Sequence, residues 1–562
     1  MNWVKKDTSK TIEEVIERNT GISIADLMDT TKEYTIKNID KVVAMIRDFI
    51  VHKERITIVG DYDADGVDAS AIMYMAISSI HRNVHVRIPR RISEGFGLSE
   101  KIIDEIPSGL VITVDNGIAA LKPVQKAKEK GLTVIVTDHH LPDESGLPAA
   151  DLIINPNAIP NSADFNGYCG AGIAFKIAEA LIPEDKKLLR QLSCFAAIGT
   201  IADVMELVHD NRRIVLEGME NMLHYDSRTT GLASILKACE LDSHITAKDI
   251  AFKVGPMINA PGRLDDNGAM IAFKALTYNG FYKESIGQEI LRINENRKEI
   301  TAKAVEKIKN TIAENCLYGD YPYVIYVPGL PEGIIGLSAG RMAEELQAPC
   351  FIFTDSSEKG ILKGSARSYG GVHLKDLLDQ CSSLLYKYGG HSEAAGVSVR
   401  LSNFDALKEA LSEHISEPIT EESADTLYYD LEIDAKDIPK TLQTLKKYEP
   451  FGNGNPQIVF KIKNFALSPR YSSWYKALGE DGSHLKLFGI GVSAIAFGQV
   501  QRYVDMKEPH NLSLLGTLSE SHFHSFSEPQ VECEDFQDTS KPVEKTKLGK
   551  ALKKIAEERY ES

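Results

Sequence analysis

Hydrophobic and polar positions alternate regularly between residues 55 and 155. Short apolar runs rich in β-branched residues are separated by longer segments with helical spacing, in the order RITIVG, DASAIMYMAISSI, VHVRI, LVITVD, LKPVQKAKEKG and LTVIVTD. Continuous apolar strands that alternate with helices are typical of βαβ units. The pattern therefore predicts an α/β domain built on a mostly parallel sheet.

The pattern changes several times beyond residue 155. Helical spacing dominates 168–225, and apolar residues recur on one side of the highly charged segment 281–315, which predicts a long helix between two domains. A second mixed α/β stretch covers about 321–415 and includes the Gly-rich segment KYGGHSEAAG, interpreted as a loop. Short strands follow the loop EPFGNGNPQ, as in a small barrel.

These changes divide the chain into six expected parts. The last of them holds six lysines and one arginine at helical spacing, and its simplest interpretation is a solvated basic helix. The parts are an N-terminal helical or extended segment (1–45), a catalytic α/β domain (46–230), a helical connector with the long helix (231–320), a second α/β domain (321–415), a barrel domain (416–540) and the basic C-terminal helix (541–562).

Composition narrows the class of protein. A chain of 562 residues with 43% hydrophobic and 26% charged residues predicts a folded, multidomain, water-soluble protein. No apolar stretch is long enough for a membrane span, and the first residues lack the apolar segment of a signal peptide, so we expect a cytoplasmic protein without a membrane partner. The seven cysteines stand singly, which argues against disulfides and zinc ribbons.

The formal net charge of -16 by itself argues against a nucleic-acid partner. Net charge is an average over the whole surface, however, and a basic groove can coexist with acidic outer faces. If this protein handles nucleic acid, its basic residues must be concentrated at a site.

Acidic residues follow three of the predicted strands. Asp61, Asp63 and Asp65 come after ITIVG, Asp115 ends LVITVD, and Asp138 ends LTVIVTD, with His139 and His140 next; Asp203, in IGTIADV, stands among small and apolar neighbours where burial is expected. The carboxyl ends of parallel strands meet at one edge of the sheet. These side chains are therefore expected to converge there.

Converging carboxylates repel one another unless cations hold them. Oxygen ligands with one or two imidazoles and no thiolate suit Mn²⁺ or Mg²⁺, and this number of carboxylates can hold two such ions in a two-metal-ion phosphodiester hydrolase. Taken separately, each piece has a plainer explanation, since a DxD after a strand is more often an N-cap and turn, and an HH pair is usually structural. Their combination favours a metal centre.

The motifs that carry these residues resemble the DHH phosphoesterase superfamily, and within it the bacterial exonucleases specific for single-stranded DNA. They are, in order, GDYDADG, VDNGI, TDHHLPD, CGAGIAF, IGTIADV, NAPGRL, EGIIG, KGSARS, GGHSEAAG and PFGNGNP. The resemblance implies a DHH domain, the long connecting helix, a DHH-associated (DHHA1) domain and a C-terminal oligonucleotide-binding (OB) barrel.

The resemblance also implies roles for individual residues. The implied metal ligands are Asp63, Asp65, Asp115, His139 and Asp203, with Asp61, Asp138 and His140 as catalytic neighbours. The implied substrate-phosphate ligands are Arg263, Ser365, Arg367 and His391; the two arginines stand in short Gly/Ser/Pro contexts, which we interpret as tight loops, although an interdomain salt bridge is the alternative. Candidate stacking aromatics are Tyr471, Trp474 and Tyr475, for which a core or loop role is the alternative.

Two positions depart from the family pattern. Asp68 stands where a hydroxyl residue is common, and Pro331 stands where a histidine usually precedes EGxIG.

The implied function is 5′-to-3′ hydrolysis of single-stranded DNA to 5′-mononucleotides, in DNA repair and recombination. The enzyme is expected to be a monomer served by single-strand-binding protein and a helicase. One alternative keeps the same catalytic core but acts on short oligoribonucleotides, cyclic dinucleotides or adenosine bisphosphate. A remote alternative is an inactive replication or repair scaffold.

Overall fold

The computed structural model describes most of the chain, and its residues form two compact units. The described residues are 1–142, 145–224, 231–241, 244–277, 283–415, 426–470, 473–479, 481–523 and 526–539. One unit comprises 29–420 and 452–454, and the other joins the N-terminal 28 residues to 421–451 and the chain from 455 onward. The expected basic helix at 541–562 lies outside the described residues.

The larger unit contains two sheets, and the first of them along the chain has five strands. The strands have the order β3-β2-β4-β5-β6, and all of their pairings are parallel. Their bounds are β2 Ile56–Val59, β3 Val84–Arg87, β4 Leu110–Val114, β5 Thr133–Thr137 and β6 Leu152–Ile154. The α/β domain expected from the apolar pattern is therefore present.

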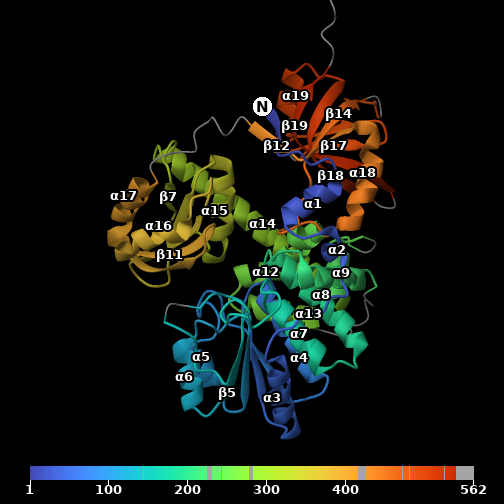
Figure 1. Ribbon diagram of the computed structural model, residues 1–562. Helices are drawn as coiled ribbons and strands as arrows, with labels where there is room; N and C mark the ends of the chain where they lie inside the picture. Colours follow the sequence, from blue (N-terminus) through green and yellow to red (C-terminus); the bar gives the residue numbers. More distant parts are fainter. Residues whose placement is uncertain are drawn as a thin grey trace, which may run out of the picture. The chain divides into compact units, whose positions relative to one another are not determined.

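Alternate residues of the central strands belong to two different cores. Ile58 and Ile112 pack with helices α3, α4 and α7 on one face, while Val59 and Val111 pack with α5 and α6 on the other (Figure 1). These helices are α3 Ile39–Val51, α4 Ala64–Ser78, α5 Glu100–Glu105, α6 Leu121–Glu129 and α7 Gly170–Leu181. Burial on both faces explains why these strands read as unbroken apolar runs.

Helices connect this domain to a second sheet. They are α8 Lys186–Ala202, α9 His209–Leu223, α10 Leu232–Ala238, α11 Ala247–Asp249, the π-helical turn η1 Ile250–Val254, α12 Gly255–Leu264, α13 Gly268–Thr277 and α14 Lys283–Glu314. The long helix expected within 281–315 is thus α14, drawn in yellow-green in Figure 1.

The second sheet has the order β10-β11-β9-β8-β7, with β7 and β8 parallel and the other pairs antiparallel. Its elements are β7 Tyr323–Tyr326, α15 Glu332–Leu346, β8 Cys350–Asp355, β9 Ile361–Arg367, α16 Leu374–Gln380, β10 Leu385–Gly390, β11 Ala394–Arg400 and α17 Phe404–His414. The Gly-rich segment interpreted as a loop lies mostly in β10 and β11, because its glycines pair across a hairpin and only 391–393 remain as the turn.

The smaller unit contains a seven-stranded sheet with the order β13-β14-β18-β19-β17-β16-β15. Its elements are β13 Leu431–Asp434, α18 Ile438–Leu445, β14 Phe460–Ala466, β15 Tyr475–Leu478, β16 His484–Phe488, β17 Ser493–Ala496, α19 Val500–Asp505, β18 Asn511–Phe523 and β19 Phe526–Asp538. The strand-rich pattern beyond the EPFGNGNPQ loop accordingly forms one sheet.

The N-terminus folds with this smaller unit. Strand β1 (Asn2–Lys5) pairs in parallel with β12 (Thr426–Tyr429), and α1 (Ile12–Thr20) and α2 (Ile24–Met28) follow it. The two units divide the chain at Met28, which is inside the segment expected to run from 1 to 45. The pairing joins residues more than 400 positions apart, which local periodicity does not report.

Among the helices of the described residues, none is both long and apolar enough to cross a membrane.

Candidate metal centre

The loops after β2, β4 and β5 meet at the carboxyl edge of the parallel sheet. Asp61 stands two residues after the end of β2, and Asp63 is the N-cap of α4, where its side chain accepts a 3.0 Å hydrogen bond from the Gly66 amide. The N-cap interpretation of DxD is thus correct for Asp63, and the same cap fixes the direction of the acidic loop.

Asp115 has a strained backbone immediately after β4. Its φ of 61° lies in the left-handed region, which a residue other than glycine rarely adopts. The next side chain, Asn116, donates hydrogen bonds to the carbonyl oxygens of Val59 and Val114, and so ties the ends of β2 and β4 together. Strain maintained by surrounding bonds is characteristic of functional positions.

The N-terminus of α7 orients Asp65. Its two carboxylate oxygens accept hydrogen bonds of 2.6 Å from the Gly170 amide and 2.8 Å from the Ala171 amide. Free amides at a helix N-terminus favour a negative charge. Asp65 is therefore held in a fixed position at the centre of the acidic cluster.

His139 lies among three carboxylates. Its Nε2 is 3.1 Å from Asp115 Oδ1, 3.5 Å from Asp203 Oδ2 and 4.0 Å from Asp65 Oδ2. Three overlapping sets have donor atoms within 4.8 Å of one another, and they are Asp115–His139–His140, Asp65–His139–Asp203 and Asp61–Asp63–Asp115. The structure thus brings together the five expected metal ligands and two of their three expected neighbours.

Several donor atoms of this cluster have no hydrogen-bond partner among the described residues. They are Asp61 Oδ2, Asp115 Oδ1 and His139 Nε2, all buried; the last two lie 3.1 Å apart but do not form a hydrogen bond with each other. Burial of such atoms is costly unless a ligand satisfies them. Because the donors are carboxylate oxygens and one imidazole nitrogen, the cluster fits Mn²⁺ or Mg²⁺.

The carboxyl groups of Asp61, Asp115 and Asp203 hold their protons more tightly than free aspartates. Burial and the charge of Asp63 raise the pKa of Asp61, and burial with the charges of Asp65 and Asp63 raises that of Asp115. The same causes raise the pKa of Asp203 to about 8. Asp203 caps the C-terminus of α8 with its side chain 31% exposed, so the burial expected for it is only partial.

Asp138 forms an ion pair with His140, a member of the cluster. Asp138 Oδ1 lies 2.8 Å from His140 Nδ1, and Oδ2 accepts a hydrogen bond from the Ile118 amide. Burial opposes charge on His140, but the bond to Asp138 outweighs it and raises the pKa of His140 to about 9. Burial lowers the pKa of His139. The two neighbouring histidines therefore have opposite protonation states at neutral pH.

Arg263 and Arg367 lie in regular elements, so their interpretation as loop residues is wrong. Arg263 is in the last turn of α12, which continues through Pro261, and Arg367 ends strand β9. Ser365 and Arg367 share one face of β9 because they are two residues apart, and Arg367 Nη1 donates a 3.0 Å hydrogen bond to Ser365 Oγ. Among the described residues, no carboxylate forms an ion pair with either arginine.

The motif EGIIG brings these two arginines close to one helix. A Cβ at Gly333 would stand 2.1 Å from the Arg263 carbonyl oxygen, and a Cβ at Gly336 would stand 3.1 Å from Ser365 Oγ and 3.2 Å from Arg367 Nη2. Glycine at both positions lets α15 approach α12 and β9. His391 lies exposed in the turn after β10, and its charge contributes to the lowered pKa of His139.

Sequence reasoning missed the loop 88–99, which borders the cluster. The Arg91 guanidinium lies 4.6 Å from the Tyr62 ring centroid, and its charge acts on Asp61, Asp63, Arg263 and Arg367. The Phe96 ring, 52% exposed, lies 5.5 Å edge-on from the His140 ring. The only sequence signal was the segment RRISEGFG, in which arginines and an aromatic residue adjoin a Gly-rich turn.

Asp68, the first departure from the family pattern, is fully buried in α4. Neither of its carboxylate oxygens has a hydrogen-bond partner among the described residues. Burial and the charges of Asp65 and Asp63 raise its pKa well above the usual range. Its carboxyl group therefore favours the protonated, neutral form more than an ordinary aspartate does. Pro331, the second departure, is the N-cap of α15.

Two of the three stacking candidates can be located, in the smaller unit. The Trp474 ring stacks on His510 with centroids 4.0 Å apart, and the Tyr475 ring meets Tyr503 edge-on while its hydroxyl donates to Glu508. One face of Trp474 is thus already occupied. Tyr471 lies outside the described residues.

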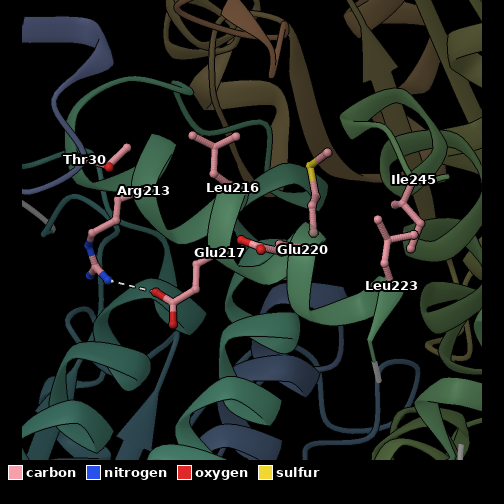
Figure 2. Close-up of a pocket in the computed structure, with 8 residues that line it drawn as sticks. Thr30, Arg213, Leu216, Glu217, Glu220, Leu223 and Ile245 are labelled. Atoms are coloured by element: carbon pink, nitrogen blue, oxygen red, sulfur yellow. Dashed lines mark hydrogen bonds and ion pairs between the residues drawn. The ribbon is translucent and has the colours of Figure 1, made fainter. Parts of the chain in front are cut away.

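A cavity of about 640 Å³ on α9 contains none of the expected site residues. Figure 2 shows the Arg213–Glu217 ion pair at one side of it and the apolar side chains of Leu216, Leu223 and Ile245 around it. It belongs to the helical part of the larger unit and has no role in the metal centre.

The class of DHH phosphoesterases is defined by a parallel sheet covered on both faces, an Asp- and His-lined carboxyl edge, and a second sheet. Arginines without carboxylate partners among the described residues lie on α12 and on this second sheet. Residues 55–200 match the model of the DHH family N-terminal domain, 320–417 that of the DHHA1 domain, and 429–535 that of the RecJ OB domain.

Curated relatives narrow the class to one family. The chain is 31% identical over 489 residues to the single-stranded-DNA-specific exonuclease RecJ of Haemophilus influenzae, covering 82% of this chain and 83% of the relative. It is 29% identical to RecJ of Bacillus subtilis, covering 89% of this chain and 64% of the relative. The chain belongs to the RecJ family.

Solved structures agree with this assignment. RecJ of Thermus thermophilus in complex with Mn²⁺ superposes with a TM-score of 0.76 at 25% identity, covering 96% of this chain and 80% of that one. An exonuclease RecJ bound to manganese gives a TM-score of 0.58 at 28% identity, covering 70% of this chain and 97% of that one. The fold expected from the motifs is confirmed, including the DHH, DHHA1 and OB domains.

Proposed function

We propose that this protein is a metal-dependent exonuclease that degrades single-stranded DNA from its 5′ end and releases 5′-mononucleotides. The observation that carries the proposal is the cluster of unpartnered carboxylate and imidazole donors at the sheet edge, close to arginines without carboxylate partners. The relatives' names supply the substrate, single-stranded DNA.

In this proposal Asp63, Asp65, Asp115, His139 and Asp203 hold two divalent cations, Mn²⁺ or Mg²⁺. When bound, the cations lower the pKa of the attacking water and offset the charge that develops on the phosphoryl oxygens. The unpartnered atoms of Asp115 and His139 support these two as ligands. The RecJ of Thermus thermophilus, which binds Mn²⁺, supports the choice of metal.

His140 is proposed to bind the phosphate under attack. With its pKa raised to about 9, its imidazole is a cation at neutral pH, and the bond to Asp138 fixes the ring orientation. A fixed cation beside the reacting phosphate stabilises the charge that develops there. Asp61 is proposed to orient the loop through the 3.3 Å bond it accepts from the Gly97 amide.

Arg263, Ser365, Arg367 and His391 are proposed to bind the terminal 5′-phosphate. Burial, together with neighbouring arginines, lowers the pKa of Arg263 to about 9, and burial with Arg91 lowers that of Arg367. A phosphate dianion would offset this crowding of positive charge. Because the 5′ end would be held at a fixed place, hydrolysis would remove one nucleotide at a time from that end.

The OB domain is proposed to bind the rest of the strand, with Trp474 and Tyr475 among its stacking groups, and Tyr471 as a further candidate. The enzyme is further proposed to act as a cytoplasmic monomer in DNA repair and recombination, on strands delivered by a helicase and single-strand-binding protein.

The test is digestion of single strands labelled at either end, with Mn²⁺, Mg²⁺ or chelator. We expect 5′-mononucleotides to be released from the 5′ end, no activity with chelator, and a loss of at least about 100-fold for Asp115→Asn. Asn tolerates the left-handed backbone of residue 115, so this variant should fold. The matched control is Asp104→Asn at an exposed position. Release from the 3′ end, or hydrolysis of dinucleotides alone, would contradict the proposal.

A further inference from the structure

A small cavity next to the metal centre is lined by polar groups from helices α12 and α14. It has a volume of about 120 Å³ and is bordered by Asn259 and Arg263 of α12, Arg297 of α14 and Leu337 of α15. Ala202, the residue before Asp203, forms part of another wall. All of these residues belong to the larger unit.

The polar groups of this cavity are poorly satisfied. Asn259 Oδ1 and Arg297 Nε are buried and have no hydrogen-bond partner among the described residues. Arg297 Nη2 donates to Asn294 Oδ1 at 2.5 Å, and Arg263 Nη1 reaches the Gly333 carbonyl only at 3.4 Å. Most of the donor capacity of the two guanidinium groups therefore remains unused.

The cavity also carries positive charge that no ion pair neutralises. Within the described part of the chain, no carboxylate lies within 4 Å of the guanidinium nitrogens of Arg263 or Arg297. Burial lowers the pKa of both arginines, and Arg341 adds to the effect on Arg297. Two nearby cations in a partly desolvated space strongly favour an anion between them.

The size of the cavity limits what this anion can be. A volume of 120 Å³ is about that of four water molecules, and sites for drug-sized molecules start at about 300 Å³. A nucleoside is therefore too large. A tetrahedral oxyanion is small enough, and it accepts hydrogen bonds from several directions, as two guanidinium groups require.

We propose that Asn259, Arg263 and Arg297 form a second phosphate-binding site, distinct from the position at Ser365 and Arg367. This inference rests on the proposed function, because Arg263 would contact both the terminal 5′-phosphate and the phosphate in the cavity. A phosphate in the cavity comes either from the bound DNA strand or from free inorganic phosphate. In the first case it helps to hold the strand in register, and in the second it occupies the cavity independently of the strand.

The test compares Arg297→Gln and Asn259→Asp with the control Arg292→Gln, which changes an exposed arginine on the same helix. The holoenzyme is assayed on 5′-phosphorylated single strands over a range of salt concentrations. Its thermal unfolding is also followed with inorganic phosphate or with chloride at equal ionic strength. Asn259→Asp is nearly isosteric, so it remains informative if Arg297→Gln does not fold.

If the ligand is a strand phosphate, KM rises about tenfold in both variants and the slope of log KM against log salt becomes shallower by about 0.7 in Arg297→Gln. If it is free phosphate, these values stay unchanged and the phosphate-dependent rise in unfolding temperature is lost in both variants. Variants that match Arg292→Gln in both measurements would overturn the proposal. Inactivity of the unmodified protein on single strands would instead contradict the proposed function, while the unfolding measurement would still report on the cavity.

Discussion

Each acidic side chain of the metal centre has a different local support. Asp63 caps a helix, Asp65 accepts hydrogen bonds from two backbone amides of another helix, and Asp115 has a left-handed backbone conformation. Sequence reasoning identified these residues because each follows an apolar strand. It could not assign their supports, since the partners of Asp65 lie more than 100 residues away.

Asp68 is the residue whose replacement should stabilise the protein. Both of its oxygens are buried without partners, whereas a serine hydroxyl at this position can bond the carbonyl one turn earlier in α4. We expect Asp68→Ser to raise the free energy of unfolding by about 1–3 kcal/mol in the metal-free protein. Urea unfolding with chelator measures this change. A destabilised Asp68→Ser protein would show that the carboxyl group has a partner of its own.

The raised pKa values predict how stability depends on pH and metal. A carboxyl group with a raised pKa stabilises the fold when protonated, so this contribution is lost as pH rises from about 4 through the folded pKa, about 8 for Asp203. With chelator, the unfolding temperature should therefore fall between pH 5 and pH 8. Mn²⁺ should raise the unfolding temperature more at pH 8 than at pH 5, because the ligands must be deprotonated to bind the metal.

Asp203→Asn is the matched variant for this measurement. With chelator, the unfolding temperature of this variant should fall less between pH 5 and pH 8 than that of the unmodified protein. At pH 8, Mn²⁺ should stabilise the variant less. An unfolding temperature independent of pH with chelator would contradict the shared burial of these carboxyl groups.

At the scale of elements, the contact between α12 and α15 shows why Arg263 was wrongly expected to lie in a loop. Pro and Gly in NAPGRL suggest a break, yet α12 continues to Leu264, since packing against its neighbours compensates for the backbone hydrogen bond that Pro261 removes. Arg263 is positioned by the contact of its carbonyl with Gly333 in α15. Such a contact between elements has no periodicity to detect.

Two glycines of α15 should respond in opposite ways to alanine. A Cβ at Gly333 would meet the Arg263 carbonyl at 2.1 Å, so Gly333→Ala should destabilise the protein by about 1–3 kcal/mol and raise KM for single strands. A Cβ at Gly340 would stand 3.9 Å from Arg367, so Gly340→Ala should be neutral or add up to about 1 kcal/mol. Denaturant unfolding and KM measurements test the pair, and equal behaviour would contradict the proposed role of this contact.

At the scale of the whole molecule, the two ends of the chain share one unit. Asp430 is fully buried and pairs with Lys6 at 3.1 Å and with Arg18. The Trp3 indole donates a 2.6 Å hydrogen bond to buried Asp535. The N-terminal residues are therefore part of the core that supports the OB sheet.

Arg18→Ala should weaken the smaller unit without affecting the metal centre. Removal of one partner leaves the buried Asp430 charge with less compensation, which costs about 1–3 kcal/mol. We expect a lower unfolding temperature and weaker binding of long strands, with dinucleotide hydrolysis unchanged. Arg292→Ala serves as the exposed control. Loss of dinucleotide hydrolysis in Arg18→Ala would contradict this separation of the two units.

The sequence by itself determined the parallel sheet, the long helix and the carboxylates at the strand ends, because these depend on local periodicity and on the residue that follows each strand. Tertiary structure alone decided that Arg91 and Phe96 border the metal centre, that Arg263 and Arg297 share a cavity, and that the N-terminal strand pairs with β12 in the smaller unit. These features arise from contacts between residues far apart in the chain, and local patterns carry no record of such contacts.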